Sequence, residues 1–198
     1  MKIIFPLIFL SLLLFSGFSQ NHKTVVYKKI NSIYKIWTKV FSFPNGLLDQ
    51  HLATILPGEN NFDHLSRNVS KYQKDIIGMI GNPKNEKEVR FIALYCLQLQ
   101  CFKKYKQSFI QIYQLFNLDK VSEDLMMSAI WQDDFSLEII RNAQSDVDIK
   151  KIILALGENP KISKKNQSLL SEILFKPDFY FSHKQDLAEV GERPFDCK

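Results

Sequence analysis

Apolar residues recur every three or four positions along most of the chain. Between residues 24 and 42 the stripe steps by four, three, four and three positions, with lysines on the opposite side, and its members are Val26, Ile30, Ile33, Trp37 and Val40. This period is typical of an amphipathic helix. Similar stripes begin near residues 63, 86, 106, 122, 135, 146 and 163, and none of the segments alternates convincingly as a strand does. The pattern predicts an all-α fold of about seven to nine short helices.

Capping and turn residues predict where these helices begin and end. Asp63 is expected to cap a helix that runs to Ile80, where Gly81-Asn82-Pro83 follows. Ser145 and Asp148 have the spacing of a capping box, and Gly157 suits the position just after the same helix. The period weakens between residues 101 and 107, where we expect a turn or a kink.

Helices of similar length, separated by short turns, favour two architectures. One is a short stack of antiparallel helix pairs of the HEAT or armadillo kind. The other is an irregular helical bundle, because no repeated motif aligns by inspection. The sequence leaves both alternatives open.

The first residues have the layout of a secretory signal peptide. Lys2 precedes an apolar run from Ile3 to Phe15, and small residues follow, with Gly17 and Ser19 at positions suited to cleavage before Gln20. The run is shorter than the ~20 residues of a spanning helix, although an uncleaved anchor is the alternative. We therefore expect a secreted or periplasmic protein with a signal peptide (1–19), a single α-helical domain (20–176) and an irregular tail (177–198) packed on that domain.

Composition is that of an ordinary globular protein, with 45% apolar and 24% charged residues. The net charge of +5 is unevenly distributed, because residues 121–149 hold seven acids against Arg141 alone. This acidic block is a candidate surface for a cationic protein partner, or it folds against neighbouring lysines. Its members in the proposed surface are Glu123, Asp124, Asp133, Asp134, Asp146 and Asp148.

Recognised catalytic and nucleotide-binding motifs are missing from the sequence, so we expect no cofactor and assign no catalytic residue. The best enzyme-like cluster contains Asp49, His51, Asp63 and His64, residue types that bind divalent metals or exchange protons. A small hydrolase or metal-dependent enzyme is therefore an alternative. The spacing matches no known ligand pattern, and we assign no metal site.

Three cysteines cannot all pair within one chain. Cys96 and Cys101 lie in a helical stretch, where a separation of five residues gives poor geometry for a bridge between them. A disulfide from Cys197 to Cys101, or alternatively to Cys96, would tie the tail to the domain. The competing interpretation is that Cys96 and Cys101 are buried thiols.

These observations favour a non-enzymatic protein-binding or structural module. A peripheral membrane protein is a further alternative, since Lys28, Lys35 and Lys39 follow one side of the first helix of the mature chain. Packing of that helix in the core explains the same pattern. Nucleic acid is not expected as a partner, because the net charge is modest.

Overall fold

The computed structural model describes residues 24–36, 38, 59–131, 138–176 and 179. Within these residues the chain is helical and contains no strand, which confirms the all-α fold. An unlabelled helix covers residues 24–36. The labelled helices are α3 (Asn60–Arg67), α4 (Val69–Ile80), α5 (Lys87–Gln98), α6 (Phe102–Asn117), α7 (Glu123–Ile130), α8 (Glu138–Asn142), α9 (Val147–Gly157) and α10 (Lys164–Phe175).

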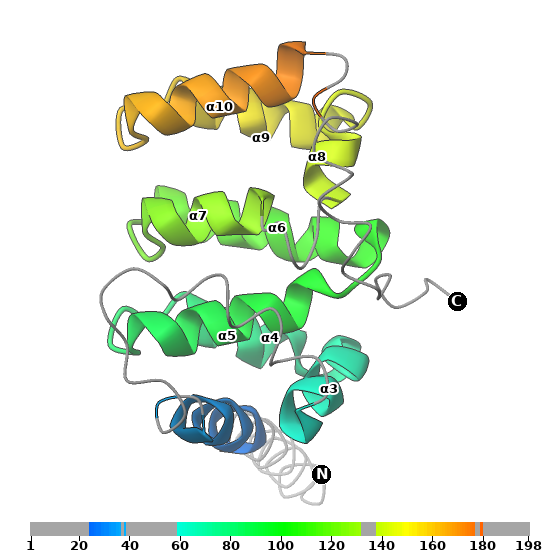
Figure 1. Cartoon of the computed structure of the whole chain (residues 1–198), viewed down its shortest axis with the longest axis vertical. Coiled ribbons are helices and arrows are strands. Elements are labelled where there is room, and N and C mark those ends of the chain that lie inside the picture. The colour runs from blue at the N-terminus through cyan, green and yellow to red at the C-terminus, as the bar shows by residue number, and fades with distance from the viewer. Residues whose placement is uncertain (1–23, 37, 39–58, 132–137, 177–178, 180–198) are drawn as a thin grey trace, which may run out of the picture.

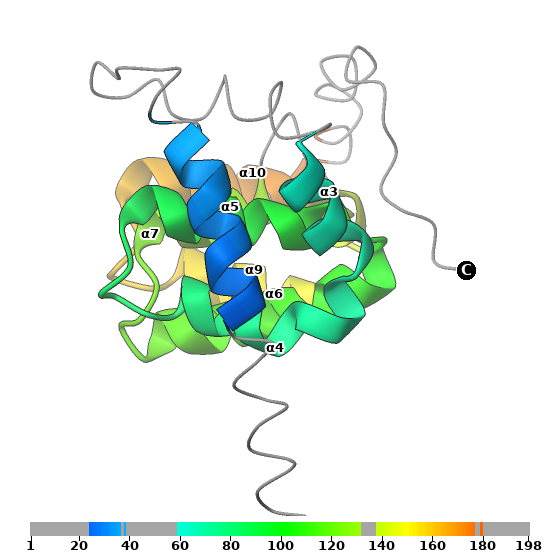
Figure 2. The same ribbon diagram turned by 90° about the horizontal axis from the view of Figure 1, so that it is seen from below.

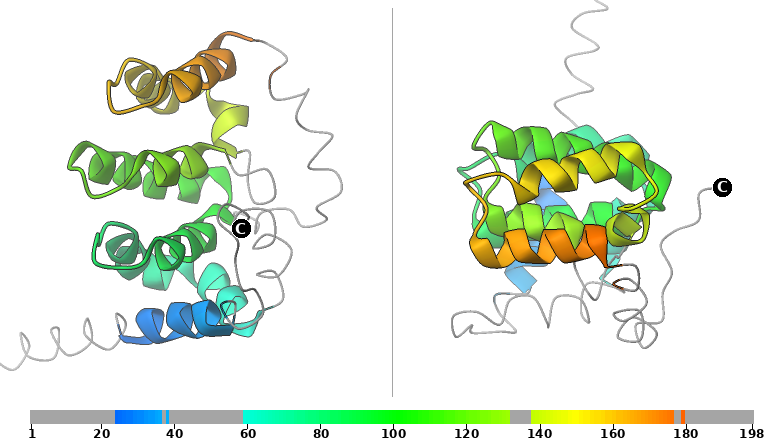
Figure 3. Two further views of the ribbon diagram at one scale, coloured as in Figure 1. Left: turned by 60° about the vertical axis from the view of Figure 1, so that its left-hand side comes forward. Right: turned by 90° about the horizontal axis from the view of Figure 1, so that it is seen from above.

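Six of the helices form three layers stacked along the long axis of the molecule (Figure 1). Layer 1 is α4 with α5, layer 2 is α6 with α7, and layer 3 is α9 with α10. The members of a layer run antiparallel, and their connecting turns lie at one common edge. We call α4, α6 and α9 the leading helices and α5, α7 and α10 the returning helices, since the two sets form separate rows (Figure 3). The fold is thus a stack of helix pairs.

The turns of layers 1 and 3 share a sequence motif that our sequence analysis missed. Asn82-Pro83-Lys84 recurs as Asn159-Pro160-Lys161, 77 residues later. In each turn the asparagine side chain accepts a hydrogen bond from the lysine backbone N–H, at 3.1 Å in layer 1 and 2.9 Å in layer 3. The same local hydrogen bond from the same residue types gives a register in which the three helix pairs can be compared.

Alignment of the layers on these turns places their core residues in register. Lys84, Lys120 and Lys161 become equivalent, with spacings of 36 and 41 residues. Side chains at three further sets of equivalent positions are buried in every layer. These sets are Tyr72, Ser108 and Ile149; Ile76, Ile112 and Ile153; and Ala93, Ala129 and Leu170.

The turn of layer 2 differs from the other two in its backbone. Asp119 takes the place of Pro83 and Pro160 and has a φ of 58°. Proline fixes φ near −65° and is excluded from such a position, whereas aspartate tolerates the left-handed region. The middle turn therefore cannot carry the motif of its neighbours, which hides the common register from inspection.

Several expected helix ends are wrong by a few residues. The helix expected between Asp63 and Ile80 is divided at Asn68 into α3 and α4, and Glu59 rather than Asp63 caps α3 by accepting a bond from the Phe62 N–H. Asp146, not Ser145, caps α9, which continues through Gly157. The turn expected within 101–107 lies before α6, which begins at Phe102.

The helix at 24–36 crosses the outer side of layer 1 at a steep angle (Figure 2). Its apolar stripe of Val26, Ile30 and Ile33 is buried, while Lys28 and Lys35 are exposed. Tyr34 donates a hydrogen bond to Glu86 just ahead of α5, and this bond is the main cause that raises the pKa of Tyr34 to about 12. The stripe that a membrane surface would need is thus used in the core. Among the described helices, none combines the length and apolarity of a bilayer span.

Candidate functional site

The described members of the acidic block each have partners within the chain. Asp133 and Asp134 lie outside the described residues. Asp124 pairs with Lys87 of α5 at 2.7 Å, across the junction of layers 1 and 2. Both side chains are more than half exposed, so this pair contributes little to stability.

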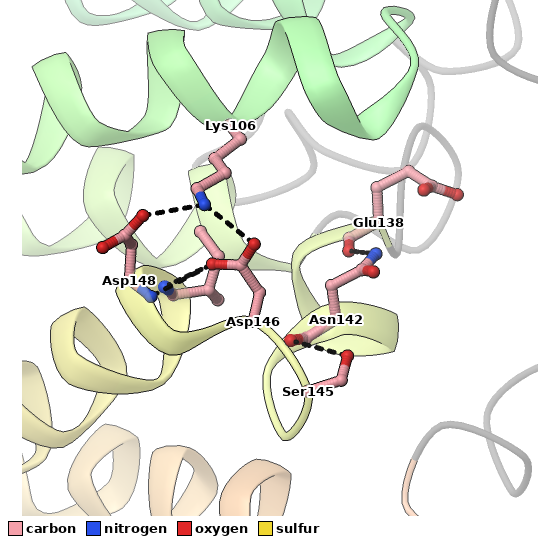
Figure 4. Close-up of polar contacts among 7 residues, drawn as sticks. Lys106, Glu138, Asn142, Ser145, Asp146 and Asp148 are labelled. Atoms are coloured by element: carbon pink, nitrogen blue, oxygen red, sulfur yellow. Dashed lines mark hydrogen bonds and ion pairs between the residues drawn. The ribbon is translucent and has the colours of Figure 1, made fainter.

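Asp146 and Asp148 share one cation at the junction of layers 2 and 3 (Figure 4). Lys106 of α6 places its Nζ atom 2.8 Å from a carboxylate oxygen of each aspartate, which raises the pKa of this lysine. Burial opposes ionisation of Asp146, but hydrogen bonds from Lys106 and from the Ile149 and Asp148 N–H groups outweigh it and hold its pKa below the usual range. These carboxylates therefore link layers 2 and 3 through Lys106.

Replacing Asp146 by alanine is expected to lower the free energy of unfolding by about 1–2 kcal/mol at pH 7, because α9 loses its cap. Since folding lowers the pKa of Asp146, the ionised carboxylate stabilises the protein above the pKa of the unfolded chain. That contribution is lost as the pH falls through the folded pKa. Urea unfolding between about pH 7 and pH 3 would therefore show the gap to the wild type narrowing. The exposed Asp124→Ala is the control, with an expected loss of about 0.5 kcal/mol or less; equal losses would contradict the distinction.

Glu123 also accepts hydrogen bonds within the stack, at the edge where the turns lie. Its Oε1 atom accepts from the Ser163 N–H at 2.7 Å and from the Asn166 Nδ2 at 2.6 Å, so it links α7 to the start of α10. Ser163 hydrogen bonding is the main cause that lowers the pKa of Glu123. All four described members of the acidic block therefore contact other parts of the same chain.

A shallow groove of about 320 Å³ lies beside Glu123, lined by residues of all three turns. Arg90 contributes its guanidinium, which donates to the backbone carbonyls of Ile80, at 2.7 Å, and of Lys120. Lys161 pairs with Asp119 at 2.5 Å across the same edge. Because these charged groups already hold the turns together, the groove offers a ligand few free polar atoms.

The enzyme-like cluster is only partly visible. Asp49 and His51 lie outside the described residues, whereas Asp63 and His64 lie in α3. The His64 ring lies near Tyr72, with its Nε2 atom 3.4 Å from the phenol oxygen, and burial together with Lys29 and Lys71 lowers its pKa. Among the described residues no three His, Cys, Asp or Glu side chains are grouped as metal ligands would be.

The cysteines divide into one bonded and one free residue in the described part of the chain. Cys101 is disulfide-bonded. Cys96 is free and fully buried in α5, and burial is the main cause that raises the pKa of its thiol. Cys197 lies outside the described residues and is the only other cysteine of the chain. A bridge from Cys101 to Cys197 remains our prediction.

Peptide mapping without reduction is expected to recover one cross-linked peptide pair that contains Cys101 and Cys197. Cys96 should react with an alkylating agent only after denaturation, because its thiol is buried. Mapping after reduction serves as the control, since both peptides must then separate. A pair that contains Cys96 would contradict the prediction.

Phe179, which follows α10 in the sequence, packs against the end of α7. Its ring is buried and meets Trp131, at the end of α7, in an edge-to-face contact with centroids 5.5 Å apart. The packing of the rest of the tail on the domain stays a prediction. Phe181 and Phe195, the other phenylalanines of the tail, lie outside the described residues.

The outer end of layer 3 carries polar residues where the inner layers carry apolar ones. Lys150 and Ser171 are exposed, whereas the equivalent Phe109 and Ile130 of layer 2 are buried. Ser168 is likewise exposed at the position of buried Phe91 and Met127. Repeat stacks require such a polar terminal layer to stay soluble. Layer 3 is thus built as an end cap.

The leading helices present the most continuous exposed surface of the described stack. Along α4 and α6 the exposed positions recur with helical spacing, and they include Ser70, Lys71, Lys74, Gly78, Lys103, Gln107, Gln111 and Gln114. By contrast, α5 is buried from Phe91 to Gln98, and α7 buries most of its residues. The row of leading helices is therefore the accessible side of the stack.

No family model, no curated protein and no solved structure significantly matches the chain. A function has to rest on the geometry of the chain itself.

Proposed function

We propose that the chain is a non-enzymatic protein-binding module that contacts its partner through the exposed side of α4, α6 and α9. The observation that carries the proposal is the contrast between the two rows of helices. The returning helices α5 and α7 are buried almost all round, while the leading helices keep one side open. One end of the stack exposes Lys150, Ser168 and Ser171 together with Leu154 and Phe175, and the helix at 24–36 covers the other end.

Site-specific photo-cross-linking tests this surface. A photoreactive residue at Gln111, exposed on α6, is expected to capture a defined partner in the native compartment. The matched control places the same residue at Ser168, which is exposed on the outer end of α10. Capture at Ser168 but not at Gln111 would move the binding surface to the end of the stack and contradict the proposal.

We propose further that residues 1–19 are a cleaved signal peptide and that the mature chain acts in the periplasm or outside the cell. The support is the sequence pattern alone: one lysine, an apolar run and small residues before Gln20. Mass spectrometry of the purified native protein is expected to find an N-terminus at Gln20. A product that begins at Met1 would contradict cleavage.

A further inference from the structure

The two rows of helices differ sharply in charge. The leading helices α4, α6 and α9 contain seven lysines and two aspartates, which give them a net charge of +5. The returning helices α5, α7 and α10 contain equal numbers of cationic and acidic residues and sum to zero. The side of the stack that is open is therefore also the side that is basic.

Four exposed lysines define what we call the basic face: Lys71, Lys74, Lys103 and Lys151. None of them forms an ion pair with the described residues. The leading helices carry only two aspartates against seven lysines, and one of the two, Asp148, already pairs with Lys106. The basic face spans all three layers of the stack.

On α4 and α6 the exposed residues between these lysines are small or polar, whereas α9 exposes Val147 and Leu154 beside Lys151. Ser70 and Gly78 lie on the exposed side of α4, and Gln107, Gln111 and Gln114 on that of α6. A membrane-binding surface needs apolar or aromatic anchors among its cations, and single-stranded nucleic acid needs exposed aromatic rings. The exposed positions of α4 and α6 provide neither. Lysines with glutamines instead suit a polar protein surface that supplies carboxylates.

We infer that the basic face docks an acidic segment or acidic surface of a protein partner. This inference rests on the proposed function and adds the chemistry of the partner. It differs from the expectation from sequence, since the described acids of the acidic block have partners within the stack, while the four lysines of the basic face have no ion pair with the described residues.

Poly-L-glutamate at low ionic strength is a direct probe of this chemistry. Changing Lys71, Lys74, Lys103 and Lys151 to glutamine is expected to weaken binding by about tenfold or more, because four cations leave one face. The matched control removes the same charge from exposed lysines elsewhere, through Lys28, Lys35, Lys164 and Lys165 to glutamine. That control is expected to change binding by about twofold or less. Equal weakening in both variants would show an effect of net charge only and overturn the inference.

Two further arms identify the class of anion. Vesicles that contain phosphatidylglycerol and a single-stranded DNA oligonucleotide are expected to bind more weakly than poly-L-glutamate. Tighter binding of either, lost in the basic-face variant, would assign the surface to that ligand and overturn the inference. Thermal unfolding of both variants checks that they fold, since all eight lysines are exposed. If the Gln111 cross-link persists in the basic-face variant, the acidic partner is wrong while the proposed function stands.

Discussion

Replacement of Ile112 by alanine is expected to lower the free energy of unfolding by about 3–4 kcal/mol. Ile112 is completely buried in α6, at the position of Ile76 in layer 1 and Ile153 in layer 3. Its layer has a neighbouring layer on each side, so the surrounding side chains cannot easily collapse into the space that the truncation leaves. Urea unfolding monitored by circular dichroism would measure the loss.

Leu118→Ala is the control for this truncation. Leu118 lies in the turn of the same layer but is 63% exposed, so its loss is expected to cost about 0.5 kcal/mol or less. In a stack where each layer contacts only its neighbours, the Ile112 variant should also lose cooperativity more readily than the Leu118 variant. A loss below about 1 kcal/mol for Ile112→Ala would contradict the central place of layer 2 in the core.

Apolar residues placed on the outer end of layer 3 are expected to increase self-association of the protein. The variant Lys150→Phe, Ser168→Met, Ser171→Ile gives layer 3 the residues that layer 2 has at the equivalent positions. In layer 2 these positions are buried, and the exposed Leu154 and Phe175 would join the same patch. A new apolar surface at the end of the stack favours contact with a second copy of the chain.

Analytical ultracentrifugation over a range of concentrations would detect the association. The matched control keeps the three positions polar, with Lys150→Gln, Ser168→Thr and Ser171→Thr, and is expected to sediment as the wild type does. If the apolar variant also sediments as the wild type does, layer 3 does not function as a cap and the register of the layers is in error.

Helical periodicity predicted the elements well because each helix buries one stripe of apolar residues. Caps were harder to predict, because polar residues compete at short range. Glu59 and Asp63 both precede buried residues of α3, and only the geometry shows that Glu59 accepts the Phe62 N–H. At α9, Ser145 and Asp146 are likewise both candidates for the cap, and Asp146 is the one whose side chain accepts from backbone N–H groups. The sequence left the stack and the bundle both open for another reason: the left-handed Asp119 interrupts the motif that layers 1 and 3 share.

Charge counts along the sequence do not show which acids of the acidic block have partners in the folded chain. Lys87 and Asp124 are 37 residues apart, Lys106 and Asp146 are 40 apart, and Asp119 and Lys161 are 42 apart. Each separation is close to the length of one helix pair. Stacking therefore brings lysines and acids of adjacent layers side by side, and the described acids of the block have partners in space. Without the length of a helix pair, the sequence gives no basis for choosing these lysines over an external partner.

The rate at which Cys96 is alkylated measures local opening of layer 1. Because the Cys96 thiol is fully buried and its pKa is raised, the native protein should not react at this site. Alkylation requires an open state in which α5 separates from the helices packed against it. The labelling rate therefore measures how often that layer opens. Such a measurement needs no introduced probe, and it would distinguish fraying of one end of the stack from unfolding of the whole.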